Sequence, residues 1–115
     1  MNMSSLPDTF AALGDSTRFA IVERLLNEGE LSAGNLQEGT PISPPAISRH
    51  LKVLREAGIV DRRIDGQRRL YSVRPQAMEA ISAWTISHRE FWEASLKRLE
   101  AALMQEVNRK EGDGK

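Results

Sequence analysis

Basic side chains are concentrated in one part of this chain, residues 49–74, where they could bind an anionic partner. This segment holds eight Lys and Arg residues against three acidic ones, whereas the whole chain of 115 residues is neutral, with 16 basic and 16 acidic residues. The basic residues are Arg49, Lys52, Arg55, Arg62, Arg63, Arg68, Arg69 and Arg74. A positive potential concentrated on one module favours binding to a polyanion such as nucleic acid. The alternative is an ordinary solvated surface, which most charge runs are.

Residues 43–57 carry the signals of a helix, which would position the first of these basic side chains. Ser43 can cap the helix through its side-chain oxygen, and Pro44 suits the first helical position because its φ is already fixed. Gly58 supplies a stop signal. The face expected to be buried consists of Ile47, Leu51, Leu54 and Ala57. The side chains between these positions are left to point away from the core.

A basic β-hairpin is predicted directly after this helix. Residues 59–64 and 69–73 have the pattern of two strands around Asp65-Gly66, a strong signal for a two-residue turn. We expect Tyr71 to pack against the helices, because duplex DNA offers no splayed base on which it could stack. A helix followed by a basic hairpin is the arrangement of a winged helix-turn-helix, in which the hairpin is the wing.

The residues before position 43 predict three shorter helices that would support this module. The first covers residues 6–13, and Asp15 can cap the second. The apolar stripe that we expect to bury on the second helix is Phe19, Val22, Leu25 and Leu26. Ser32 can cap a short third helix that carries Leu36, and a turn at residues 39–41 leads into the next helix.

One long amphipathic helix is predicted from Pro75 to about Asn108, which gives a mainly α fold of about five helices with a two-stranded wing. Its apolar stripe consists of Met78, Ile81, Trp84, Phe91, Trp92, Leu96, Leu99, Leu103 and Val107. A single short domain has no obvious interior for so long a stripe, so we expect much of it to face a second copy in a homodimer. The alternative is packing on its own domain. We expect one domain over residues 1–110 and a frayed polar tail over residues 111–115.

The composition excludes several kinds of chemistry. The chain has no Cys, so it can form no disulfide, thiolate nucleophile or sulfur-ligated metal site. It has no Gly-rich phosphate loop, HExxH or GxSxG motif, and we therefore expect neither an enzyme nor a cofactor. No apolar run reaches the ~20 residues that span a bilayer, and residues 1–13 lack the features of a signal peptide. We expect a cytoplasmic protein with no membrane partner.

The run PPAISRHLKVLREAGIVDRRIDGQRRLYSV resembles the recognition helix and wing of the ArsR family of bacterial transcriptional regulators. Upstream, ALGDSTRFAIVERLLNEGELS is similar to the second-helix opening of that family. The resemblance implies a homodimer joined through its first and last helices, with each recognition helix in a major groove of a palindromic operator. In many members it also implies repression relieved by an inducer, so a small-molecule or protein effector is possible. The expected interface residues are Leu6, Phe10, Trp84, His88, Phe91, Trp92, Leu96 and Leu99.

The best-known members of this family sense metals, but this sequence departs from their pattern. In the last helix only His88 could serve as an imidazole ligand, with Glu90 and Glu93 as nearby carboxylates. A single His in this helix makes a poor zinc site. We therefore expect no metal site and interpret His88 as an interface residue. The alternatives are a metal-responsive repressor of the same fold and a winged-helix module that binds protein or RNA.

The family resemblance and the helix pattern together indicate how the module would bind double-stranded DNA. Side chains near the start of a recognition helix reach base edges, and the peptide N–H groups there suit a phosphate. The expected DNA-binding residues are Ser43, Pro44, Ala46, Ser48, Arg49, His50 and Lys52 on the helix, with Arg62, Gln67 and Arg68 on the wing. Arg49 could form two hydrogen bonds with guanine, whereas Lys52 is better placed for phosphate. Pro44 stands where many relatives carry Gln, and it cannot make that polar base contact.

Some of these residues have alternative roles that involve no DNA. Ser48 could fill a small polar position in the helix packing. His50 could cap a packing contact, although we favour a DNA contact. Arg18 could bind phosphate, but capping or a salt bridge explains it equally well. Arg55 could pair with a carboxylate, and both residues are left out of the expected site.

Overall fold

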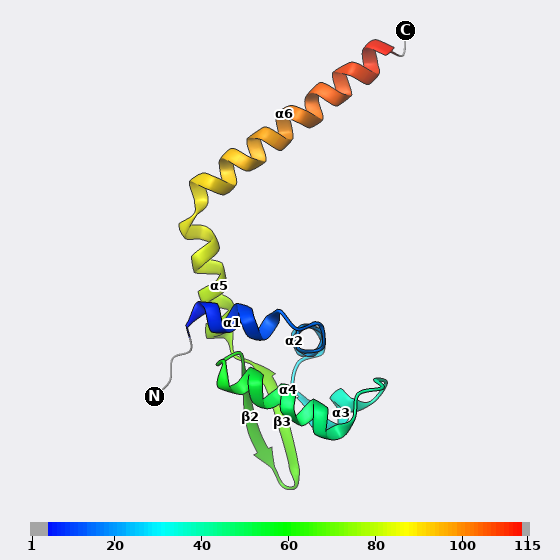
Figure 1. Ribbon diagram of the computed structural model, residues 1–115, viewed down its shortest axis with the longest axis vertical. Helices are drawn as coiled ribbons and strands as arrows, with labels where there is room; N and C mark the ends of the chain where they lie inside the picture. Colours follow the sequence, from blue (N-terminus) through cyan, green and yellow to red (C-terminus); the bar gives the residue numbers. More distant parts are fainter. Residues whose placement is uncertain (1–4, 114–115) are drawn as a thin grey trace. The chain divides into compact units, whose positions relative to one another are not determined.

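The helices and strands follow the order of a winged helix-turn-helix, with one additional strand. The computed structural model describes residues 5–113 (Figure 1), and the chain forms two units, Met1–Ile81 and Ser82–Lys115. Residues 1–4 of the expected domain and residues 114–115 of the expected tail lie outside the described residues. The elements are α1 (Leu6–Leu13), α2 (Ser16–Glu28), β1 (Leu31–Ser32), α3 (Ala33–Gln37), α4 (Pro44–Glu56), β2 (Val60–Asp65), β3 (Arg68–Val73), α5 (Pro75–Ser87) and α6 (Arg89–Asp113).

The wing belongs to a three-stranded antiparallel sheet, and the expectation of two strands was therefore incomplete. The strand order is β1-β3-β2, with Leu31 paired to Tyr71 at the added edge. The turn also lies one residue later than predicted, because Asp65 pairs with Arg68 and leaves Gly66 and Gln67 as its two central residues. Gly66 has φ +64°, a left-handed conformation that glycine adopts without the steric cost of a Cβ.

The hydrophobic core of the first unit is built around α4. Ile47, Leu51 and Leu54 are all buried, as their spacing predicted. They pack in one cluster with residues of α2, α3 and the sheet, which include Ile21, Val22, Leu25, Leu36, Val60 and Tyr71. Tyr71 is buried in agreement with the expected packing role. This cluster fixes α4 against α2 and α3 on one side and beside the hairpin on the other (Figure 1).

The buried face of α2 differs from the predicted stripe. Phe19 and Leu26 are each 52% exposed, whereas Ile21 is buried together with Val22 and Leu25. With 3.6 residues per turn, Ile21, Val22 and Leu25 share one side of the helix. Phe19 and Leu26 lie about a quarter turn away from the centre of that side. The expectation that Phe19 and Leu26 belong to the core was wrong, because the buried side of α2 is centred on Ile21, Val22 and Leu25.

The last predicted helix is two helices, so the expectation of one continuous helix was wrong. The break falls at His88, whose backbone N–H donates to the carbonyl of Thr85 at 3.2 Å instead of to the fourth residue back. The carbonyl of Trp84 accepts hydrogen bonds from Oγ of Ser87 at 2.7 Å and from Nδ1 of His88 at 2.9 Å. These side chains take the place of the missing backbone bond.

The second of these helices, α6, continues to Asp113, past residue 110 where the sequence predicted the start of the tail. No helix in the described part of the chain combines the length and the apolar character needed to cross a bilayer.

Candidate nucleic-acid interface

The start of α4 is capped as predicted, but it offers no free backbone donor. Oγ of Ser43 accepts from the backbone N–H of Ala46 at 3.3 Å, and the carbonyl of Ser43 accepts from that of Ile47 at 3.0 Å. Pro44 and Pro45 have no backbone N–H. Within residues 44–47, all of them described, every amide N–H is therefore already bonded. The expectation that this terminus suits a phosphate through its peptide groups was wrong, because two consecutive prolines and the cap leave none available.

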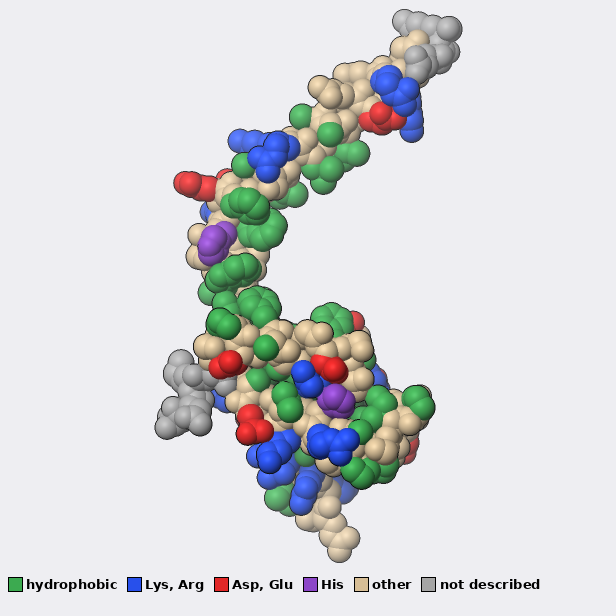
Figure 2. Space-filling model, in the orientation of Figure 1, with side chains coloured by type: hydrophobic (Ala, Val, Ile, Leu, Met, Phe, Trp, Pro, Cys, Tyr) green, Lys and Arg blue, Asp and Glu red, His purple; other side chains and the backbone are tan. Residues whose placement is uncertain are grey.

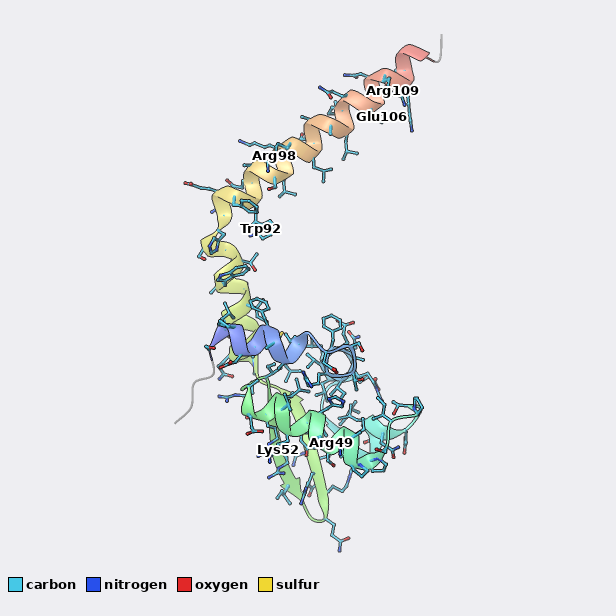
Figure 3. All side chains as sticks on the ribbon, in the orientation of Figure 1. Arg49, Lys52, Trp92, Arg98, Glu106 and Arg109 are labelled. Carbon is cyan, nitrogen blue, oxygen red and sulfur yellow. The ribbon has the colours of Figure 1, made fainter. Side chains whose placement is uncertain are left out.

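The residues expected to contact DNA on and before α4 form three groups that differ in position and exposure. Arg49 and Lys52 point outward along the helix (Figure 3), and both are exposed together with Ser48. Ala46 and His50 are half-buried on the flank that faces α2. Ser43 and Pro44 are exposed at the start of the helix. Of the residues expected on α4, Arg49 and Lys52 are the exposed ones that carry a positive charge.

His50 lies in a polar cluster with two residues at the start of α2. Its Nδ1 is 3.4 Å from Nη1 of Arg18 and 3.9 Å from Oδ2 of Asp15. Arginine only donates, so Nδ1 of His50 accepts and the ring proton of the neutral form sits on Nε2. The Nε of Arg18 donates to the carbonyl of Ala12 at 2.7 Å, which fixes the guanidinium in place. Arg18 and His50 thus connect α2 to the recognition helix.

Asp15 serves as the N-cap of α2 in this cluster. Its Oδ2 accepts from the backbone N–H of Arg18 at 3.0 Å, and this hydrogen bond lowers the pKa of the Asp15 carboxyl. The positive charge of Arg18 acts in the same direction. An ionised Asp15 stabilises the helix N-terminus, where the backbone dipoles favour a negative charge.

The basic residues of the wing lie on two opposite faces of the hairpin, because strand side chains alternate. Arg62 pairs with buried Tyr71, and Arg63 pairs with Leu70, so these neighbouring arginines point in opposite directions. Arg68, next to the turn, shares the face of Arg63. Figure 2 shows several Lys and Arg side chains gathered over α4 and β2. Gln67 is exposed in the turn itself.

Two wing arginines are engaged with carboxylates. Arg63 donates to both carboxylate oxygens of Glu30 at 2.8 Å, and Nε of Arg74 lies 3.6 Å from Oδ1 of Asp61. Arg62 and Arg68 make no ion pair with any residue between positions 5 and 113. The two wing arginines that were expected to contact DNA are thus outside any ion pair among the described residues, whereas Arg63 is bound to Glu30.

The residues expected at a subunit interface are distributed over both units. In the first unit Leu6 is half-buried and Phe10 is exposed. In the second unit all the expected interface residues are exposed: Trp84, His88, Phe91, Trp92, Leu96 and Leu99. The rings of Phe91 and Trp92 contact each other edge to face, with centroids 5.1 Å apart. Trp92, Arg98, Glu106 and Arg109 of α6 are labelled in Figure 3.

The described residues contain no group of three or more His, Cys, Asp and Glu side chains able to hold a metal ion. His88 donates through Nδ1 to the carbonyl of Trp84 in α5, and the two rings are 5.1 Å apart between centroids. Its role in the described structure is at the break between α5 and α6.

The chain matches known regulators in both sequence and fold. Residues 13–63 match a family model described as a helix-turn-helix domain. The HTH-type transcriptional regulator Rv2034 of Mycobacterium tuberculosis is 47% identical over 76 residues, which cover 65% of this chain and 70% of the relative. The transcriptional repressor SdpR of Bacillus subtilis is 32% identical over 80 residues, 70% of this chain and 88% of the relative.

Solved structures lead to the same family. The crystal structure of the ArsR family transcriptional regulator RHA00566 superimposes with a TM-score of 0.70 at 27% identity, over 76% of this chain and 96% of that chain. The capped α4, the basic hairpin and the sequence relatives agree with this likeness. The chain belongs to the ArsR family of winged helix-turn-helix proteins and is a DNA-binding transcriptional regulator.

Proposed function

We propose that this regulator binds a palindromic operator as a homodimer and represses transcription from it. The observation that carries the proposal is the exposure of Arg49 and Lys52 on α4, beside a wing whose Arg62 and Arg68 are free of ion pairs within residues 5–113. The unpaired cations of α4 and the wing provide electrostatic affinity for duplex DNA, and α4 also provides the contacts with base edges.

Each group of residues has a separate role in this proposal. Arg49 reads a base edge in the major groove, with Ser48 and Ala46 on either side of it. Lys52 binds backbone phosphate, and Ser43 and Pro44 shape the entry of the helix into the groove. Arg68 and Gln67 at the tip of the wing contact the minor groove or its phosphates, and Arg62 contacts phosphate beside α4. His50, held by Arg18, positions the helix and approaches phosphate from its α2 side.

A dimer is supported by the row of apolar residues along α6. Trp92, Leu96, Leu99 and Leu103 follow one another at intervals of four, three and four residues, which is the spacing of a helix-helix seam. All four are exposed in the chain, with Trp92 42% exposed. A second copy would cover this row, with Leu6 and Phe10 of α1 contributing to the same interface, as in the family. Two recognition helices related by a twofold axis match a palindromic site.

Repression is supported by the relative SdpR, which is itself named a transcriptional repressor. A repressor must reach the chromosome to bind its operator, so we place the protein in the cytoplasm. The effector in this proposal is a small molecule or a protein. The chain works without a cofactor in this proposal.

Selection of bound genomic fragments with the purified protein tests the proposed function. The expected result is enrichment of a short palindrome whose half-sites are about one helical turn apart, 10–10.5 bp, upstream of one or a few genes. A reporter placed behind the recovered site should become more active when the regulator is deleted. Enrichment of single-stranded or asymmetric sites, or none, would refute the dimeric operator model.

A further inference from the structure

The structure contains a basic groove between α4 and β2, which Lys52 of the outer face of α4 shares with residues that were not expected to contact DNA. We propose that this groove binds one phosphate of the DNA backbone and that Arg55 is a main ligand. This inference rests on the proposed function, because it assumes that α4 approaches duplex DNA. Arg55 was left out of the site expected from the sequence.

The groove has a volume of about 420 Å³ and is lined mainly by charged side chains. Lys52 and Arg55 enter it from α4, and Arg62 enters it from β2. The remaining lining residues are Glu56, Val60, Asp61 and Arg74. Cations from two different elements therefore converge on one concave surface, which suits an anion with several acceptor oxygens.

The cations of the groove differ in whether they are already neutralised. Arg74 lies 3.6 Å from Asp61, and the two charges offset each other. Lys52, Arg55 and Arg62 form no ion pair with any of residues 5–113. With Glu56 counted against these three, the groove keeps an excess positive charge. An excess of positive charge in a cleft attracts an anion more strongly than the same charges would on a flat surface.

The position of Arg55 on the helix explains how it would act together with the outer face. Ser48, Lys52 and Arg55 are spaced by four and three residues, so they form one row along the flank of α4 that faces the wing. A DNA strand that passes Ser48 and Lys52 would continue toward Arg55 and meet Arg62 from the wing. The row predicts that one backbone segment contacts α4 and β2 together.

The start of α4 makes this groove more important than it would be in a helix with free amides. Pro44 and Pro45 lack an N–H, and the N–H of Ala46 is bonded to Ser43. The usual backbone contact between a helix N-terminus and a phosphate is therefore missing. Side chains hold the phosphates instead in this proposal. The groove brings together three cationic side chains without an ion pair among residues 5–113, namely Lys52, Arg55 and Arg62.

The test compares Arg55→Ala with Lys110→Ala, which removes one positive charge from α6, outside the groove. Binding to operator and to scrambled duplex is measured by fluorescence anisotropy at several salt concentrations. For Arg55→Ala we expect a similar fold-loss on both duplexes and a salt dependence whose slope decreases in magnitude by about 0.9, the value for one lost phosphate contact. Lys110→Ala should keep the wild-type slope, and Arg55→Lys should restore most of it.

Three outcomes would overturn the assignment. An unchanged slope in Arg55→Ala would mean that the groove holds no phosphate, and a loss confined to the operator would mean that Arg55 reads a base. Binding of inorganic phosphate by the DNA-free protein, abolished in Arg55→Ala, would make the groove a free-anion site. Thermal melting of each variant checks that it is folded. If the wild-type protein binds no duplex at all, the proposed function itself fails, which separates the two claims.

Discussion

Arg63 donates two hydrogen bonds of 2.8 Å to the carboxylate of Glu30, and this pair ties β2 to the loop that precedes β1. The bidentate geometry fixes the wing at its middle and neutralises one of its arginines. Among the wing arginines that remain without an ion pair within residues 5–113, Arg62 lies beside α4 and Arg68 lies next to the turn. The two arginines lie on different faces of the hairpin.

Replacement of Glu30 by Gln should remove a pH-dependent part of the stability. The hydrogen bonds from Arg63, with help from its charge, lower the pKa of Glu30 from its ordinary value of 4.5. The ionised carboxylate therefore stabilises the folded state above pH 4.5, and this contribution is lost as the pH falls through the lower folded pKa. The melting temperature of Glu30→Gln should lie below that of the wild type near neutral pH, and the difference should shrink in acid.

Thermal melting as a function of pH, monitored by circular dichroism, measures this difference. Glu79→Gln is the matched control, because Glu79 is exposed on α5 and has no ion pair among residues 5–113. A difference between Glu30→Gln and wild type that stays constant from neutral pH into acid would contradict the role assigned to the ion pair.

Truncation of Leu54 should destabilise the fold far more than truncation of Leu26. Leu54 is 0% exposed at the centre of the core cluster, whereas Leu26 is 52% exposed. Leu54→Ala leaves a cavity and should cost about 2–5 kcal/mol, while Leu26→Ala should change stability by about 0.5 kcal/mol or less. Urea unfolding of the two variants gives both values. Equal losses of unfolding free energy in the two variants would mean that Leu26 makes a buried contact that the described structure lacks.

Replacement of Trp92 by Glu should dissociate the proposed dimer. The substitution puts a charge into the apolar row of α6, where desolvation makes it costly at a subunit interface. Ala101→Glu adds the same charge to the opposite side of the same helix and serves as the control. Sedimentation should show a monomer for Trp92→Glu and a dimer for the control, and operator affinity should fall only for Trp92→Glu. A dimeric Trp92→Glu protein would exclude this helix as the interface.

The parts of the fold that were predicted from sequence have strong local signals. Ser43, Ser32 and Asp15 each cap a helix in the structure as expected, because capping depends on residues only three positions apart. The buried row on α4 followed from regular spacing, and Gly58 has the positive φ of 75° expected at a helix end. These features needed no knowledge of distant contacts.

The features that were missed depend on contacts remote in sequence or on competition between bonds. Strand β1 has two residues and exists because Leu31 and Ser32 pair with β3, about forty residues later. The break at His88 arises because side chains of Ser87 and His88 bond to the carbonyl of Trp84, and nothing in the apolar pattern reveals that choice. The shifted turn depends on whether Asp65 pairs with Arg68, a difference of one register position.

The sequence predicted which side chains on the outer face of α4 are exposed, but not which of them lie in the groove beside β2. Arg49 and Lys52 are exposed as expected, because they lie opposite the buried row of α4. The place of Arg55 in the groove required the position of β2, which no helix pattern contains. The sequence signal for Arg55 was its spacing from Ser48 and Lys52, by four and then three residues, which places the three side chains on one side of α4. This spacing does not reveal which element that side faces.

Competition titration of Arg49→Ala and Lys52→Ala against operator and scrambled duplexes tests the central claim most directly, namely that α4 reads DNA sequence. Loss of a base contact should cost Arg49→Ala about 1–3 kcal/mol on the operator with little change on scrambled DNA. Lys52→Ala should weaken both duplexes alike and reduce the salt slope by about 1, as expected for a phosphate contact. Equal losses on both duplexes for Arg49→Ala would contradict base reading by α4.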